Sequence, residues 1–232
     1  MRETVVLPLP PELARHLPDP VLGILLERIA AAEEEFARTV HGVTYRGNPY
    51  TFGGLRRHVC EGLFALVREF RPRRMVETGV CNGVSTAVVL AAMERNGVGH
   101  LYSVDLPEYT DTAYPEGTFW EGKLGAVVPR GRSPGWLVPA HLRSRWTLHV
   151  GRSQEILPSL LAELGDIDAF LHDSEHSYEC MQFEYRLAWR HLTVGGVLIS
   201  DDISWNTAFA DFAREVGRVP VFIDQNMAFL VK

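Results

Sequence analysis

From Arg74 to the end of the chain, short runs of β-forming residues alternate with stretches of helical periodicity, and this alternation most constrains the fold. Strands separated by helices predict a mostly parallel sheet with helices on both faces, which is a doubly wound α/β fold. Its ligand site is expected at the carboxyl ends of the strands. The predicted strands cover residues 75–78, 101–105, 146–150, 167–173, 197–201, 219–224 and 227–231, and the predicted helices cover 84–95, 154–164, 177–192 and 206–216.

The first seventy residues have a different pattern. Apolar residues recur every three or four positions over 20–38 and over 54–70, which predicts two amphipathic helices. The segment between them, 41–53, has no clear periodicity. We therefore divide the chain into an N-terminal helical cover at residues 1–70 and a Rossmann-like domain at residues 71–232.

Composition argues against several classes of function. With 23 Lys plus Arg against 29 Asp plus Glu, the formal net charge is −6, which disfavours a nucleic-acid partner. Three scattered cysteines, with no Cys-x-x-Cys pair, offer neither a disulfide framework nor a common zinc site. No stretch is apolar enough for a signal peptide or a membrane span, so we expect a cytoplasmic protein with no membrane partner.

The predicted first strand ends in Glu77-Thr-Gly-Val-Cys-Asn-Gly-Val-Ser, a Gly-x-x-x-Gly turn that opens a helix. Such a turn lets a ligand approach the backbone, and the helix N-terminus offers unpaired N–H groups to an anion. A dinucleotide fold would place a glycine where Cys81 stands. Glu77 would repel a phosphate and suits a cationic group instead. An NAD-dependent dehydrogenase is therefore the weaker interpretation of this turn.

The second predicted strand ends in Asp105. A carboxylate at this place can accept two hydrogen bonds from a ribose diol, as in dinucleotide-binding enzymes. Capping of the following turn is the alternative role. Asp105 thus supports a nucleoside ligand without choosing between cofactors.

These residues resemble the class I S-adenosylmethionine-dependent methyltransferases over about residues 70–232. The turn from Glu77 to Gly83 is similar to their first motif, Asp105 to their ribose-binding acid, and Gly151-Arg152-Ser153 to the loop beside the adenine. The resemblance implies a seven-stranded sheet of order 3-2-1-4-5-7-6 with the last strand antiparallel, and S-adenosylmethionine as cofactor. It implies cofactor-binding roles for Glu77, Gly79, Asn82, Gly83, Ser85, Asp105 and Ser153.

Three further carboxylates follow the fourth and fifth predicted strands. Asp173 ends the fourth, and Asp201 and Asp202 end the fifth. In a parallel sheet these ends are neighbours, so the three side chains could converge. Clustered carboxylates repel one another unless a cation neutralises them, and oxygen ligands favour Mg²⁺, Mn²⁺ or Ca²⁺ over Zn²⁺. Helix capping is the competing role.

This arrangement resembles the metal-dependent O-methyltransferases, both catechol-type enzymes and those that modify sugars of antibiotics. The resemblance implies that Asp173, Asp201 and Asp202 hold the metal and that Asp173 takes part in catalysis. Catechol-type relatives use a lysine as base near this region, but this chain has only two lysines. We predict instead that His176 is the base, because histidine titrates near neutrality. His172 is the alternative.

The segment 106–145 is too long for an ordinary connection. Its aromatic residues indicate either a lid over the acceptor or an oligomer contact. Four aromatic residues are predicted to contact the acceptor, namely Trp120, Trp136, Tyr50 and Trp205. We also expect a homo-oligomer, a dimer formed through the N-terminal helices.

The leading hypothesis is a divalent-metal-assisted O-methyltransferase acting on a small hydroxylated molecule: a natural product, a sugar or an aromatic. A metal-independent enzyme or an N-methyltransferase of the same fold is one alternative. Another is a non-catalytic protein that binds S-adenosylmethionine as an interaction or sensing module.

Overall fold

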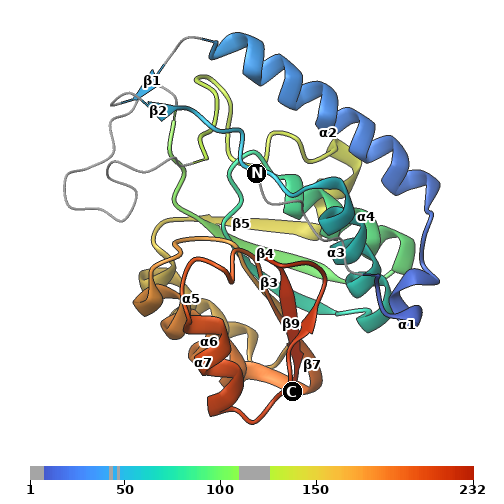
Figure 1. Cartoon of the computed structure of the whole chain (residues 1–232), viewed down its shortest axis with the longest axis vertical. Coiled ribbons are helices and arrows are strands. Elements are labelled where there is room, and N and C mark those ends of the chain that lie inside the picture. The colour runs from blue at the N-terminus through green and yellow to red at the C-terminus, as the bar shows by residue number, and fades with distance from the viewer. Residues whose placement is uncertain (1–7, 42–43, 46–47, 110–125) are drawn as a thin grey trace.

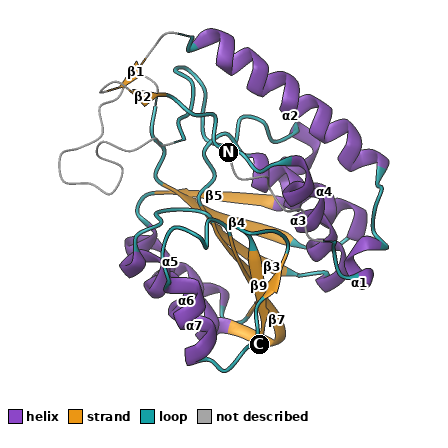
Figure 2. Cartoon of the chain, viewed as in Figure 1, coloured by secondary structure: helices purple, strands orange, loops and turns teal. Residues whose placement is uncertain are grey.

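The structure, a computed structural model, describes residues 8–41, 44–45, 48–109 and 126–232. A seven-stranded sheet runs through its centre, with helices on either side (Figures 1 and 2). The strands are β3 (Arg74–Thr78), β4 (His100–Asp105), β5 (Trp146–Val150), β6 (Ile167–His172), β7 (Leu192–Ser200), β8 (Val221–Phe222) and β9 (Ala228–Val231).

The sheet has the order β5-β4-β3-β6-β7-β9-β8. Neighbours from β5 to β7 are parallel, whereas β9 runs antiparallel to both β7 and β8. Numbered along the chain, the seven strands are therefore arranged 3-2-1-4-5-7-6. The predicted doubly wound fold and its strand order are confirmed.

Two groups of helices cover the two faces of the sheet (Figure 1). One buried core joins one face to the N-terminal helices and α4, and a second core joins the other face to the three later helices. The N-terminal helices thus share a core with the sheet. The helices are α1 (Pro11–Ala14), α2 (Pro20–Thr39), α3 (Arg57–Phe70), α4 (Val84–Asn96), α5 (Ser153–Leu164), α6 (Tyr178–His191), α7 (Ala208–Glu215) and the 3₁₀ helix η1 (Ala140–Arg145).

The start of α2 shows how the cover is held in place. The Asp19 carboxylate accepts a hydrogen bond from the amide of Val21 at 2.9 Å and so caps the helix. Its other oxygen accepts one from Arg95 Nε on α4 at 3.0 Å. One side chain thus begins the helix and ties it to its neighbour.

Among the described residues, no helix is both long and apolar enough to cross a bilayer.

Several element ends differ from the sequence prediction. Helix α3 begins at Arg57 rather than at residue 54. Residues 52–56 are irregular, and Gly53 has a φ of +64° and lies against Ala126. Strand β7 begins at Leu192, directly after α6, and is longer than predicted. The segment predicted as irregular contains a two-stranded hairpin, β1 (Thr44–Tyr45) and β2 (Asn48–Pro49).

Backbone hydrogen bonds extend the sheet beyond the strand ends. The amide of Gly79 donates to the carbonyl of Val104, that of Asp173 to Thr78, and that of Gly151 to Asp105, each at 2.9 Å. These bonds bring the residues that follow four neighbouring strands to one edge. The sheet thereby positions the site.

Gly79 is the tightest point of this edge. Its φ is +86°, and a Cβ built on it would overlap the carbonyl oxygen of Asp173. We expect Gly79→Ala to lower the free energy of unfolding by roughly 3 kcal/mol, because strain and overlap add. Gly97 has a similar φ of +69° but open space around it, so Gly97→Ala should cost only about 1 kcal/mol. Urea denaturation measures both, and equal losses would contradict the close packing at Gly79.

Candidate active site

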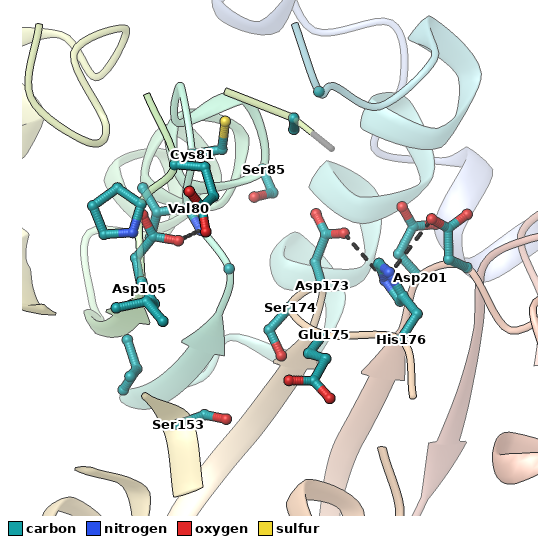
Figure 3. A pocket seen from close by; sticks show the side chains of 18 of the residues that line it. Val80, Cys81, Ser85, Asp105, Ser153, Asp173, Ser174, Glu175, His176 and Asp201 are labelled. Atoms are coloured by element: carbon teal, nitrogen blue, oxygen red, sulfur yellow. Dashed lines mark hydrogen bonds and ion pairs between the residues drawn. The ribbon is translucent and has the colours of Figure 1, made fainter. Parts of the chain in front are cut away.

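A cavity of about 520 Å³ opens at the carboxyl ends of the strands (Figure 3). Nine of the predicted site residues line it: Gly79, Ser85, Asp105, Ser153, Asp173, His176, Asp201, Asp202 and Trp205. Five others do not, namely Glu77, Asn82, Gly83, Tyr50 and Trp136. Trp120 lies outside the described residues. The structure thus gathers most of the predicted residues around one space.

Asp105 offers an unused acceptor to this cavity. Its Oδ1 accepts a hydrogen bond from the amide of Val80 at 2.9 Å (Figure 3). Its Oδ2 is buried and makes no hydrogen bond to any of the described residues. Burial raises the pKa of the carboxyl group. A buried acceptor of this kind is normally satisfied, so the second oxygen is suited to a hydroxyl donor from a ligand.

Glu77 lies behind the wall of the cavity rather than on it. Its carboxylate is fully buried and accepts hydrogen bonds from the hydroxyls of Ser85, Thr86 and Ser103 at 2.7, 2.8 and 2.7 Å. Burial raises the pKa of Glu77 to about 7, although these three hydrogen bonds oppose the shift. Because Ser85 itself lines the cavity, Glu77 reaches the site through that hydroxyl.

Asn82 and Gly83 complete the turn without facing the cavity. Gly83 precedes α4 with a φ of +92°, and a Cβ there would lie 2.7 Å from the Cα of Gly135. The side chain of Asn82 is wholly buried and bonds to other protein groups. The motif around these two residues therefore shapes the turn.

Three carboxylates lie on the opposite wall. Burial and the neighbouring charges of Asp201 and Asp202 raise the pKa of Asp173 well above its ordinary value. Burial, followed by the charge of Asp202, raises the pKa of Asp201 to about 7, and burial also raises that of Asp202. All three residues line the same cavity, and Asp173 and Asp202 lie 4.0 and 3.8 Å from His176 Nε2, so these strand ends place three half-buried carboxyl groups on one wall.

The predicted metal site was tested against this geometry. Oxygen donors and mutual repulsion suit a hard divalent cation. Within the described part of the chain, however, no group of three His, Cys, Asp or Glu side chains is arranged to hold a metal ion. The donor chemistry fits, but the three carboxylates do not form a coordination group as they stand.

His176 lies between two of these carboxylates. Its Nε2 is 4.0 Å from Asp173 Oδ1 and 3.8 Å from Asp202 Oδ2 (Figure 3). Its ring stacks on Trp205 at a centroid distance of 5.3 Å, and Trp205 is 46% exposed at the cavity. Burial, followed by the nearby His172, lowers the pKa of His176 to about 3, which favours the neutral ring. A neutral imidazole has a nitrogen acceptor, but with so low a pKa it can act as a base only where a nearby negative charge raises that pKa.

The sequence prediction missed a buried pair beneath this wall. His172 Nδ1 lies 2.6 Å from Glu184 Oε2, and both side chains are fully buried. Glu184 also accepts hydrogen bonds from Thr78 and Ser174. Burial opposes ionisation, but contact with His172 outweighs it and lowers the pKa of Glu184. A charged residue on the apolar face of a predicted helix was the available signal.

Two of the predicted acceptor-binding aromatic residues have other surroundings. Tyr50 packs against the core shared by the N-terminal helices. The indole of Trp136 donates from Nε1 to Asn82 Oδ1 at 2.6 Å, and Arg132 lies 4.8 Å from the ring centroid. Trp205 is thus the one predicted aromatic residue among the described residues that lines the cavity.

The sheet order and the cavity at its carboxyl edge define a Rossmann-like methyltransferase fold. A family model described as a methyltransferase domain matches residues 76–203, which is more than half of the chain. The chain belongs to this family, and we identify it as an S-adenosylmethionine-dependent methyltransferase. No curated protein matches the sequence significantly.

Solved structures share the fold at low sequence identity. The O-methyltransferase NovP has a TM-score of 0.61 and 16% identity, over 91% of this chain and 97% of that one. An O-methyltransferase from Bacillus cereus, in complex with SAH, has a TM-score of 0.56 and 14% identity, over 95% of each chain. The O-methyltransferase TomG from Streptomyces achromogenes is involved in tomaymycin synthesis and was solved in complex with SAM. It has a TM-score of 0.55 and 16% identity, over 94% of this chain and 93% of that one.

The raised pKa of Glu77 predicts a pH-dependent stability. Between the ordinary pKa of 4.5 and the folded value of about 7, the folded protein binds more protons than the unfolded one. Stability contributed by this group is therefore full below the lower value and is lost as pH rises through the upper one. Between about pH 5 and about pH 8, Glu77 should lower the free energy of unfolding by roughly 2–3 kcal/mol. In Glu77→Gln we expect this part of the decline to be absent.

Urea denaturation across this range measures the effect. Glu163→Gln is the matched control, because Glu163 is exposed on α5. It should leave the pH dependence as in the unmodified protein. If the free energy of unfolding of Glu77→Gln falls with pH as steeply as that of the unmodified protein, the raised pKa of Glu77 is contradicted.

Proposed function

We propose that the protein transfers the methyl group of S-adenosylmethionine to a hydroxyl of a small molecule. One observation carries this proposal: a single cavity has the unpartnered oxygen of Asp105 on one side and His176 among carboxylates on the other. The first feature suits the ribose of the donor. The second suits the removal of a proton from an acceptor.

On the donor side, Asp105 would accept hydrogen bonds from the ribose hydroxyls, and Ser153 would lie near the adenine. Ser85, backed by Glu77, would face the amino-acid end, whose ammonium group is cationic. The carboxylates of the far wall favour the sulfonium charge electrostatically. Gly79 would let the donor lie close to the backbone. All these residues except Glu77 line the cavity.

Methyl transfer is an in-line displacement, so the protein must align donor and acceptor and make the acceptor electron-rich. The exposed face of Trp205 offers a platform for the acceptor next to His176. His176 would accept the hydroxyl proton at a ring nitrogen as the oxygen attacks the methyl carbon. Binding of the cationic donor would favour the ionised forms of Asp173 and Asp202, which lie 4.0 and 3.8 Å from His176 Nε2. Their negative charge would then raise the low pKa of His176 and stabilise the imidazolium.

Metal assistance is the finer part of the proposal. Asp173, Asp201 and Asp202 would hold Mg²⁺, Mn²⁺ or Ca²⁺ after side-chain rotation. When bound, such an ion would lower the pKa of the acceptor hydroxyl. The raised pKa values of the three carboxyl groups support this, because a cation relieves their repulsion. The small-molecule acceptor, the dimer and the cytoplasmic location stay predictions.

The donor site is tested by Asp105→Asn. Loss of a charged acceptor should weaken binding of S-adenosylhomocysteine, the donor product, by roughly 10- to 100-fold in titration calorimetry. Asp166→Asn is the control, because Asp166 is exposed and directly precedes β6, at the end of this strand that is remote from the cavity. It should bind as the unmodified protein does. Absence of binding by the unmodified protein at millimolar ligand would refute the proposed function.

The metal is tested by chelation and by Asp201→Asn. We expect EDTA to reduce transfer to a panel of catechols and hydroxylated sugars by roughly 100-fold, with recovery on adding Mg²⁺. Asp201→Asn should also weaken Mn²⁺ binding, followed by electron paramagnetic resonance, by roughly 10- to 100-fold. Glu175→Gln is the control, because Glu175 lines the same cavity outside the predicted ligand set. Full activity in EDTA would favour the metal-independent alternative.

A further inference from the structure

We propose that Asn82 is a positioning residue, which holds two separate segments of the chain in place as walls of the donor side of the cavity. The first segment is residues 51–55, here called the strap, and the second is residues 126–128. The role assigned to the cavity rests on the proposed function. The mechanical role of Asn82 rests on the contacts alone.

The amide group of Asn82 makes three hydrogen bonds to groups far away in sequence. Its Nδ2 donates to the carbonyl of Phe52 at 2.6 Å and to that of Val127 at 3.0 Å. Its Oδ1 accepts from Trp136 Nε1 at 2.6 Å. The side chain is fully buried, and both hydrogens of its NH₂ group are used. Asn82 therefore binds protein segments rather than the donor.

The two segments that Asn82 joins also meet each other. The amide of Val127 donates to the carbonyl of Thr51 at 3.1 Å. A Cβ built on Gly53 would overlap that of Ala126 and would lie 3.8 Å from Cys81 Sγ. Thr51, Gly53 and Ala126 all line the cavity. The strap and Ala126 thus line the cavity side by side, next to the turn that follows β3. The amide of Val128 also donates to the carbonyl of Glu108 at 2.7 Å, so Asn82 shares the second segment with one backbone bond.

An asparagine is the fitting residue for this junction. One NH₂ group supplies two donors in a plane, and here they point to two carbonyl oxygens. An aspartate would direct oxygen at the same carbonyls and repel both. An alanine would leave buried carbonyls without these donors, which destabilises their positions. The turn itself is held by the sheet, since Gly79 donates to Val104. Asn82 therefore transmits the rigid position of the turn to the two walls.

The matched control is another buried asparagine. Asn96 donates from Nδ2 to the carbonyl of Val67 at 2.8 Å and joins the ends of α3 and α4. It is not among the described residues that line the cavity, and its hydrogen bonds there go to Arg71 and Val67. Asn96→Ala therefore removes a comparable buried contact without touching the strap.

The experiment measures hydrogen exchange and binding on the full chain. We expect Asn82→Ala to speed amide exchange at Val127 by about 10-fold or more while the sheet amides remain protected. We also expect S-adenosylhomocysteine to bind about 10-fold or more weakly, with KM for the donor rising more than kcat falls. Trp136→Phe removes one of the three hydrogen bonds and should show a smaller change of the same kind. It keeps the test valid where Asn82→Ala fails to fold.

Unchanged exchange at Val127 in both variants would overturn the proposal. So would equal effects of Asn82→Ala and Asn96→Ala on exchange and binding, because Asn82 would then be only a structural residue. Failure of the unmodified protein to bind S-adenosylhomocysteine would instead refute the proposed function. The exchange comparison would still decide the role of Asn82.

Discussion

The gathering of carboxyl groups at the carboxyl edge of the sheet is the constraint on which the site depends. Parallel pairing brings the ends of β3, β4, β6 and β7 together, and each end carries or precedes an acid. The pKa values of Glu77, Asp105, Asp173, Asp201 and Asp202 are all raised, with burial as the largest cause. A cationic ligand is therefore favoured here, because a positive charge stabilises the ionised forms of these groups. A sulfonium nucleoside fits this need better than a phosphate-bearing cofactor.

The remainder of the fold supports that edge from below. Glu184 on α6 bonds to Thr78 at the end of β3 and to His172 and Ser174 around the end of β6. One carboxylate therefore links two strand ends beneath the cavity. Removing one partner of such a buried pair costs several kcal/mol, because the other is left uncompensated. The wall that carries His176 thus rests on a rigid polar layer.

Much of this arrangement could be predicted from the sequence. The strand-end acids were recognisable because parallel strands end at one edge, and Asp105, Asp173 and Asp201 all line one cavity. Resemblance to known methyltransferases was needed for the strand order. The buried position of Glu77 is harder to predict, because it depends on which hydroxyls of α4 and β4 surround the side chain. Local sequence carries no record of such neighbours.

Long-range contacts explain the other differences. Trp136 was assigned to the acceptor because aromatic residues in long loops often bind ligands. In the structure its indole serves Asn82 instead, 54 residues away in sequence. Asn82 itself stood within a cofactor motif, which favoured a direct contact. Its partners at Phe52 and Val127 become evident only when the N-terminal segment folds over the turn.

The two sides of the cavity are therefore built in different ways. The acceptor side consists of strand ends and the loops that follow them, held by the backbone ladder and the Glu184 layer. On the donor side, two walls come from the strap and from residues 126–128. Asn82 bonds to both, and the amide of Val128 also donates to the carbonyl of Glu108, after β4, at 2.7 Å. The two walls also bond to each other, because the amide of Val127 donates to the carbonyl of Thr51 at 3.1 Å. The position of the strand-end residues is therefore set by the sheet, whereas the position of the two walls depends on contacts between segments that are far apart in sequence.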